Sequence, residues 1–344
     1  DVFVGTAIVV PAAPPPDAAD DVRLRQNRTA INTSSGNQTF SQSGLGGLIP
    51  KSARFIITTA TADGSAVNGE AFGYGATAGG AEWAAAVASE HGVANVNAAR
   101  KWTDDACLLL VDGSGNELVR ATFVEWVADG VTVNIQWTGT PTAYLVQVVL
   151  GAGTEYEAWI GTAALGTSGS STNVSCGFAA DAVRGVATWG SRETGETDAT
   201  LSMGLAHRNG GQYVLERYYR DGLADGANLM RLFDGQLFHC RYNTAARADA
   251  KVTAWSSSGF TLSVTSDNIN STGLVMAEKF GAVGSRVALV DSAIITGNQD
   301  YTLDWNPQYA EHLLSQATGL GSINDAARGG TIGIHVVTDD GEYS

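Results

Sequence analysis

Apolar and polar residues alternate in short runs along most of the chain, and Gly, Asn, Asp or Ser residues separate one run from the next. In TFVEWVADGVTVNIQW (122–137) the alternation continues on both sides of Gly130. A two-residue period around a glycine turn is typical of a β-hairpin with one buried face. The alanine-rich segment 80–102 is predicted as a strand followed by a loop. The pattern therefore predicts an all-β protein of antiparallel β-sandwich or jelly-roll-like domains.

The pattern also repeats. Trp83, Tyr213 and Tyr343 stand 130 residues apart, each after a glycine-containing turn and a Glu or Gln. Units of about 130 residues exceed solenoid repeats, which run to about 50, so each unit is predicted to be a whole domain. The recurrent corner is interpreted as a turn that brings an aromatic residue into each sandwich core. The predicted divisions are a joining strand and Pro-rich connector at 1–30, repeat 1 at 31–158, repeat 2 at 159–288 and a partial repeat 3 at 289–344.

Other landmarks extend the repeat. The hairpin 122–137 matches 251–266, which pairs Trp126 with Trp255, and both tryptophans are predicted to lie in the core. Three further sets are aligned: strand glycines (Gly73, Gly204, Gly333), closing-strand glycines (Gly151, Gly281) and joining strands (2–10, 158–166, 286–297). Aromatic residues that do not recur are predicted to make surface contacts: Trp102, Trp137, Trp189 and Tyr219.

The third repeat stops at Ser344, at a position that Val214 matches in the second. Half a sandwich leaves strand edges unpaired and a core uncovered. We therefore expect either that the chain is an excerpt of a longer protein, which is the favoured alternative, or that another chain supplies the missing strands.

Composition narrows the classes of partner. Hydrophobic residues make up 44% and charged residues 16% of the 344, which predicts a folded, turn-rich protein. The net charge of −15 argues against nucleic acid or an anionic membrane as a partner. No apolar run reaches the roughly 18 residues of a membrane span, so no membrane insertion is expected. Cys107, Cys176 and Cys240 lack a CxxC spacing and are interpreted as small buried hydrophobes.

No candidate for catalysis stands out. The five histidines form no HxH or HExxH motif, although His207 and His335 fall close to equivalent places. DGSGNEL (112–118) has the spacing of a calcium loop, but a hairpin turn is favoured, because the far glutamate of an EF-hand is missing. The acidic pairs are interpreted as solvated loops: Asp104 with Asp105, Glu155 with Glu157, Asp339 with Asp340. We therefore predict no catalytic, cofactor-binding or metal-binding residues and no cofactor.

Several motifs carry a resemblance. GFAADAV (177–183) and its proline-containing variants LIPKSA (48–53) and WNPQYA (305–310) open the units, SMGLA (202–206) ends a strand, and AWSSSGFTL (254–262) forms a hairpin. This arrangement resembles the modules of tailed-bacteriophage virion proteins, particularly tail and tail-fibre components, over nearly all of residues 31–344. Ala180 departs from the pattern, where the other copies have Pro50 and Pro307.

The resemblance implies a non-enzymatic virion protein, a tail fibre, spike or other tail-associated appendage that attaches to the host surface through repeated β-domains. The implied location is the virion surface, outside the cell. The implied partners are other virion proteins, copies of the chain itself and a host cell-surface glycan or receptor. Two alternatives stay open: a secreted bacterial adhesin or carbohydrate-binding array, and an architectural head decoration or tail-shaft cover.

Overall fold

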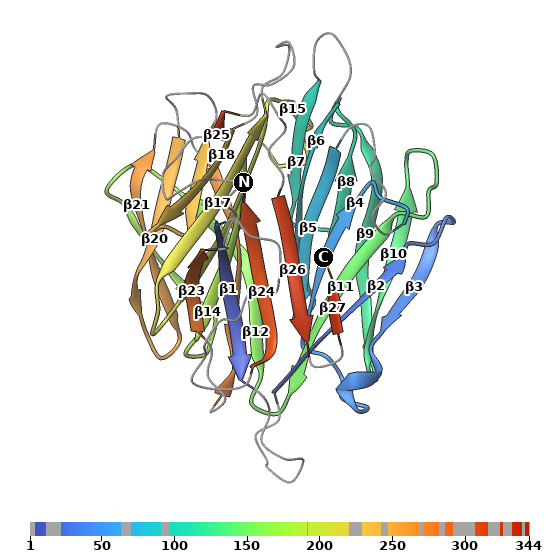
Figure 1. Cartoon of the computed structure of the whole chain (residues 1–344), viewed down its shortest axis with the longest axis horizontal. Coiled ribbons are helices and arrows are strands. Elements are labelled where there is room, and N and C mark those ends of the chain that lie inside the picture. Colours follow the sequence, from blue (N-terminus) through green and yellow to red (C-terminus); the bar gives the residue numbers. More distant parts are fainter. Residues whose placement is uncertain are drawn as a thin grey trace.

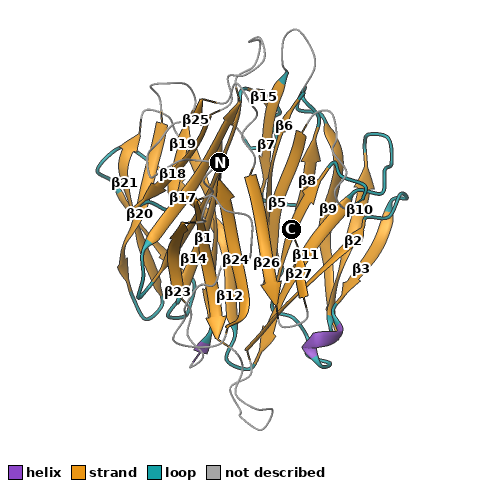
Figure 2. Ribbon diagram, viewed as in Figure 1, coloured by secondary structure: helices purple, strands orange, loops and turns teal. Residues whose placement is uncertain are grey.

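Strands make up nearly all of the regular structure (Figure 1, Figure 2). The computed structural model describes residues 4–11, 22–62, 70–90, 97–190, 192–219, 229–241, 247–267, 271–281, 286–291, 307–315, 324–325, 332–338 and 341–343. Within these ranges all strand pairs are antiparallel, and the helical structure is limited to 3-10 turns, η1 (Ser43–Leu45) and a turn at Gly281. The all-β prediction is confirmed. The predicted Pro-rich connector, 11–21, lies outside the described residues except for Pro11, which ends β1.

The first sandwich consists of two sheets. Inner sheet 1 has the order β15 (Glu196–Thr197), β7 (Ala98–Thr103), β6 (Ala81–Ser89), β5 (Glu70–Ala78), β4 (Ser52–Thr58), β11 (Leu145–Gly153), β2 (Val22–Ala30). Outer sheet 1 has the order β3 (Gly36–Ser41), β10 (Gly130–Trp137), β9 (Glu117–Val127), β8 (Leu108–Val111). Their facing side chains, among them Phe40, Phe55 and Leu109, form one apolar core. The segment 80–102 supplies β6 and most of β7, so its prediction as strand followed by loop is confirmed for the strand at its start and wrong for 98–102, which pair with β6.

The second sandwich is built in the same way. Inner sheet 2 has the order β12 (Glu157–Leu165), β22 (Ser271–Lys279), β14 (Ala182–Trp189), β16 (Ala199–His207), β17 (Gln212–Tyr219), β18 (Leu229–Asp234), β25 (Asn324–Asp325). Outer sheet 2 has the order β13 (Ser171–Ser175), β21 (Gly259–Asp267), β20 (Arg247–Trp255), β19 (Phe238–Arg241). Phe238, Phe260 and Val275 lie in the core between these two sheets.

A third sheet joins the two ends of the chain. Its order is β23 (Arg286–Asp291), β1 (Val4–Pro11), β24 (Pro307–Ser315), β26 (Ile332–Thr338), β27 (Gly341–Tyr343). In Figure 1 its strands β1, β24 and β26 lie in front, between the strands of the two sandwiches. The N-terminal strand is thus hydrogen-bonded on both sides to C-terminal strands.

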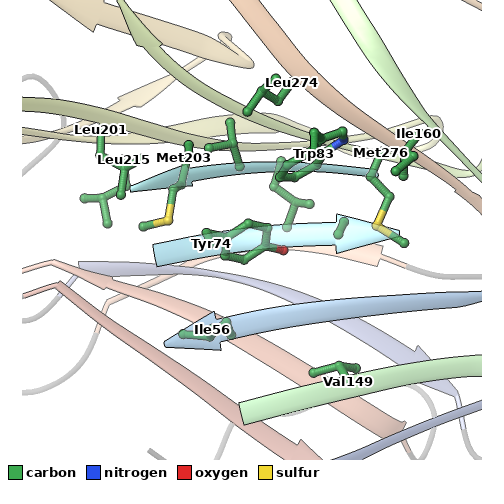
Figure 3. Packing of buried hydrophobic residues seen from close by; sticks show 14 of the residues in the cluster. Ile56, Tyr74, Trp83, Val149, Ile160, Leu201, Met203, Leu215, Leu274 and Met276 are labelled. Carbon is green, nitrogen blue, oxygen red and sulfur yellow. The ribbon is translucent and has the colours of Figure 1, made fainter. Parts of the chain in front are cut away.

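The inner sheets are buried on both faces because they also pack on each other. In β4, Phe55 faces outer sheet 1, whereas Ile56 faces inner sheet 2. Figure 3 shows side chains of both inner sheets pointing into this shared layer, including Tyr74 and Trp83 from one sheet and Met203 from the other. Strands buried on both faces read as nearly continuous apolar runs, which is why 52–58 and 182–187 lack a clean alternation.

Inner sheet 1, inner sheet 2 and the third sheet contact one another in a head-to-tail order. Strands β12, β14 and β16 lie against β5, β6 and β7; β23 and β24 lie against β16 and β18; and β2 lies against β24 and β26. Two short strands cross between sheets in the same order: β15 joins β7, and β25 joins β18. Each sheet therefore contacts the other two, and the three form a closed cycle of the kind that cyclic trimers form from separate subunits.

The aromatic corner recurs as predicted, but its aromatic side chains point elsewhere. Trp83 pairs with Ala76, and Tyr213 pairs with Leu205 at the matching register. Trp83 is 1% exposed, and its indole Nε1 donates to the backbone oxygen of Val275 in the other inner sheet at 3.1 Å. The interpretation that this corner feeds each sandwich core is therefore wrong. Trp83 and Tyr213 pack in the layer between the inner sheets.

Strand register corrects two of the glycine alignments. Gly75 pairs with Phe55, and Gly204 pairs with Gly185, at matching levels of the two sheets, so Gly204 corresponds to Gly75 and not to Gly73. A Cβ at Gly204 would lie 1.7 Å from the carbonyl oxygen of Leu237, and one at Gly75 would lie 2.1 Å from that of Cys107. Glycine is required where the outer sheet approaches so closely.

The same comparison corrects the other alignments. Gly151 pairs with Ser52, and Glu278 pairs with Ala182, the residue that matches Ser52 in the second sandwich. Gly151 therefore corresponds to Glu278, three residues before the expected Gly281. His335 pairs with His312 at the level of Gly204, so His207 and His335 are not equivalent.

The N-terminal strand does not hold the expected joining position. β1 lies between β23 and β24, as β22 lies between β12 and β14 and as β11 lies between β2 and β4. It thus takes the place of a closing strand. The joining position in the first sandwich belongs to Val22–Ala30, which pairs with β11 along its whole length although the sequence assigned it to the segment 1–30. The apolar β1 resembles the joining strand β12 in composition, whereas Val22–Ala30 is rich in Arg, Gln and Asn, so composition indicated the wrong strand.

Candidate functional site: a groove between the two sandwiches

An open groove of about 500 Å³ lies where the first sandwich meets the second. Both sandwiches contribute to its walls. Its lining residues are Pro50, Lys51, Gly79, Trp126, Glu157, Ala158, Trp159, Cys176 and Phe178. They come from the start of β4, the turn after β5, the end of β9, the start of β12 and the segment after β13.

Two half-buried indoles give the groove its apolar surface. Trp126 packs at the edge of the first core, with its ring centroid 4.9 Å from that of Phe123. Trp159 packs at the edge of the second core and lies over Gly161, where an added Cβ would come within 2.5 Å of the indole. Each ring is therefore held against a fixed surface while part of it stays accessible to solvent.

Charged groups border these rings. Lys51 is exposed, and its Nζ donates to the backbone oxygens of Tyr156 at 2.7 Å and Thr154 at 3.3 Å. Glu157, with its side chain 40% exposed, forms an ion pair with Lys279. Both charged groups are thus held in place by protein contacts. An ammonium group has three N–H donors, and two of those on Lys51 are used in this way.

A buried hydrogen-bond network involves Ser52 and Tyr156, the chain neighbours of Lys51 and Glu157 in the groove. The link between β11 and β12 carries Tyr156, whose hydroxyl donates to Glu278 at 2.7 Å and lies 2.7 Å from the Ser52 hydroxyl. Arg184 Nε donates to the other oxygen of Glu278 at 2.8 Å. Burial on its own would raise the pKa of Glu278, but the charges of Arg184 and Arg54 and these hydrogen bonds lower it. Glu278 is therefore held as a carboxylate that ties the two sandwiches together.

The equivalent corner of the second sandwich is filled. Trp255 occupies the position of Trp126, opposite the first residues of the next strand. Arg208 is the first residue after β16, and Gly79 is the first residue after the equivalent strand β5 in the first sandwich. The Arg208 guanidinium lies 5.3 Å from the Trp255 ring centroid and donates to the backbone oxygens of Ala180 at 2.8 Å and Ser256 at 2.9 Å. Arg208 thus covers a surface that Gly79 leaves open.

Two histidines lie in the interior. His239 is 1% exposed, its Nδ1 lies 2.5 Å from Asp249 and its Nε2 lies 3.4 Å from Glu216. Burial alone would lower its pKa, but these carboxylates reverse the effect and raise the pKa to about 9. Burial and the charge of Arg208 lower the pKa of His207 to about 4.

The remaining histidines, His91, His312 and His335, lie outside the residues whose side chains are described. At these three histidines the prediction of no metal motif stays a prediction.

The predicted hairpin turn at 112–118 is confirmed. Asp112 Oδ1 accepts from the backbone N–H groups of Ser114 and Asn116, both at 2.9 Å, so the carboxylate closes the turn between β8 and β9. Asp104 and Asp105 pair with Arg192, and thus join loops of the two sandwiches. Among the described residues, no group of three or more metal-ligating side chains occurs. Asp339 and Asp340 lie outside the described residues.

The predictions for the aromatic residues are partly wrong. Trp126 and Trp255 are half-buried at the edges of the cores, not enclosed in them. Trp102 and Tyr219, expected at the surface, are 7% and 3% exposed and pack between the inner sheets. Trp137 and Trp189 are half-buried.

Sequence reasoning missed Trp159. Its signal was the glycine two residues later on the same face of the strand, at Gly161.

The cysteine prediction is confirmed: Cys107, Cys176 and Cys240 are buried and free. In the part of the chain that the structure describes, no helix is long and apolar enough to cross a membrane. Comparison of the chain with protein-family models, with curated proteins and with solved structures finds no match.

Proposed function

We propose that this chain is a non-enzymatic structural protein of a tailed-bacteriophage virion, part of a tail fibre, spike or other tail-associated appendage that contacts the host surface. The observation that carries the proposal is the crossing of strands between successive sheets, β15 onto β7 and β25 onto β18. Separating the sheets would expose the backbone groups of these strands, which favours one rigid body over beads on a flexible string. An appendage that transmits force needs such rigidity.

The buried ionisable groups support a structural role. Glu278 and His239 are 0% and 1% exposed, and each is bonded to charged partners inside the protein. Catalytic groups with shifted pKa values are expected in a cleft that a substrate can reach. These groups hold sheets together instead.

The groove favours one alternative over the other. A secreted adhesin or carbohydrate-binding array would also use half-buried tryptophans at a domain junction, as Trp126 and Trp159 are placed. It is the second candidate. A head decoration or tail-shaft cover needs no such groove and has no specific feature in its favour.

Location on a particle tests the proposal. Mass spectrometry of gradient-purified virions and gold-labelled antibody against the chain are expected to find it in particles, on the tail or its appendages. Label on the capsid head would support the decoration alternative. Recovery only from particle-free culture fluid would contradict a virion role and support the adhesin. Release of reducing ends from host polysaccharide by purified protein would contradict the non-enzymatic assignment.

A further inference from the structure

The groove combines two features that suit one class of ligand. Its walls carry accessible indole surface from Trp126 and Trp159, and its border carries a cation at Lys51 and a carboxylate at Glu157. A pyranose ring has an apolar C–H face and a ring of hydroxyl groups. Indole surface packs against the first, while a carboxylate accepts from hydroxyls and an ammonium donates to them.

We infer that this groove binds a neutral saccharide, whose C–H face packs on Trp126 and Trp159 and whose hydroxyl groups bond to Lys51 and Glu157. The inference rests on the proposed role in surface attachment and names the ligand class for it. A volume of about 500 Å³ accommodates one or two sugar units and leaves a longer chain free to extend into solvent, since the groove is open.

Charge decides between neutral and anionic sugars. The chain has a net charge of −15, and Glu157 stands in the groove itself. An acidic saccharide would meet the negative field of the whole chain, because the charge of Lys279 is balanced by Glu157 and two of the three Lys51 donors already bind backbone oxygens. Neutral hexoses and N-acetylhexosamines avoid this cost.

The corner of the second sandwich that matches the groove is occupied by protein. Arg208 lies over Trp255 and is held there by two backbone oxygens. Gly79 stands at the same corner of the first sandwich, with no atom within 4 Å of an added Cβ. Trp126 therefore keeps indole surface that a ligand can contact, whereas Arg208 contacts the matching surface of Trp255.

A small open site binds weakly. One sugar unit at the ligand efficiency of drug-sized molecules gives a dissociation constant on the order of millimolar. Many copies on one particle raise the apparent affinity by two to four powers of ten, about what attachment to a glycan-covered surface needs.

Saturation-transfer-difference NMR on the whole chain tests the inference, with maltotetraose, cellotetraose, mannotetraose and chitotetraose as neutral probes and sialyllactose and a sulfated disaccharide as anionic ones. We expect transfer to at least one neutral probe and none to the anionic ones. Trp126→Ala and Trp159→Ala are expected to weaken binding at least tenfold.

Matched variants separate binding from folding. Trp255→Ala removes the equivalent indole from the second sandwich and is expected to leave saccharide binding unchanged. Gly79→Arg is expected to weaken binding by covering Trp126. Gly79→Asn tolerates the left-handed φ of +58° without reaching the ring, and it is expected to bind as the wild type does.

Three results would overturn the site: no transfer to any neutral probe, transfer to the anionic probes alone, or equal losses from Trp126→Ala and Trp255→Ala. The test of the saccharide site is independent of the test of the virion role. Saccharide binding by a protein found only in particle-free fluid contradicts the virion role and keeps the site. A virion protein that binds no neutral probe keeps the role and loses the site.

Discussion

The two sandwiches share a frame and differ in what fills it. At the corner, Gly79 in the first sandwich leaves Trp126 accessible, whereas Arg208 in the second covers Trp255. The turn residue at this corner thus differs together with the partner of the indole, which is Arg208 in the second sandwich and open space in the first. Repetition of a fold therefore need not repeat a site.

The cores differ as well. Leu109 and His239 occupy equivalent positions, since each pairs with the matching residue of the next strand, Arg120 in the first sandwich and Asp249 in the second. In the first sandwich Leu109 packs in the core, and the ion pairs of Arg120 with Asp105 and Glu193 are partly exposed. In the second, His239 is buried between Asp249 and Glu216. The second sandwich thus places a buried charge where the first has a leucine.

The largest effect is expected at this charged cluster. His239→Leu reproduces the residue of the first sandwich but leaves Asp249 and Glu216 buried without their cation. We expect a loss of about 3 to 5 kcal/mol in the free energy of unfolding, measured with urea. Leu109→Ala in the first sandwich is the comparison, with about 3 kcal/mol from the cavity alone. A change below about 1 kcal/mol for His239→Leu would show that the cluster contributes little.

Stability should also depend on alkaline pH through His239. Its pKa is raised from 6.5 to about 9 in the folded protein by Asp249 and Glu216, which outweigh its burial, so the folded state retains a proton that the unfolded state releases. The contribution is complete below pH 6.5 and is lost as pH rises through about 9.

The difference in pKa corresponds to about 3 kcal/mol. Cys240 lies near the same carboxylates, and burial together with the charges of Glu216 and Asp249 raises the pKa of its thiol well above this pH range, so it adds nothing to the slope. The nearby Arg100 guanidinium stays charged throughout. Urea midpoints between pH 6 and 9.5 measure the slope. A curve for His239→Leu that falls as steeply as the wild type's would assign the slope to other groups.

The close-approach glycines should respond in order of their contacts. Gly204→Ala is expected to cost about 3 kcal/mol and Gly75→Ala somewhat less, because the added Cβ atoms would lie 1.7 Å and 2.1 Å from carbonyl oxygens of the outer sheets. Gly166→Ala is the control, since its nearest atom is the Ser170 hydroxyl at 3.3 Å. Thermal unfolding measures all three. A loss at Gly204 or Gly75 no larger than that at Gly166 would contradict the close approach of the outer sheets.

The smallest effect is expected at the covered corner. Arg208→Ala removes two hydrogen bonds to backbone oxygens and the contact with Trp255, at a cost of about 1 kcal/mol. The Arg208→Ala variant leaves Trp255 without its covering side chain, as Trp126 is in the first sandwich. Quenching of tryptophan fluorescence by acrylamide should increase in this variant, and an unchanged quenching constant would mean that Arg208 does not shield Trp255.

The sequence predicted what depends on local pattern. Alternation and glycine turns identified the strands, and the spacing of Trp83 and Tyr213 aligned the corners correctly. The closing strands were aligned wrongly at Gly151, because a constant spacing of 130 residues was assumed. The loops before these strands differ in length, so the equivalent residues are closer in sequence than that.

What the sequence could not predict lies between units. The groove brings together Lys51, Gly79, Trp126 and Trp159, which are far apart in the chain and belong to two sandwiches. Their proximity follows from the packing of the inner sheets on each other, and that packing leaves no periodic signal. The same limit explains Trp102 and Tyr219, which were expected at the surface because they did not recur.

The accessibility of individual tryptophans tests the central comparison most directly. Hydroxyl-radical footprinting of the whole folded chain, with oxidation of each tryptophan quantified by mass spectrometry, ranks them in one experiment. We predict that Trp126 and Trp159 are oxidised several times faster than Trp255, and that Arg208→Ala brings Trp255 close to the rate of Trp126. Equal rates for Trp126 and Trp255 in the wild type would contradict the account.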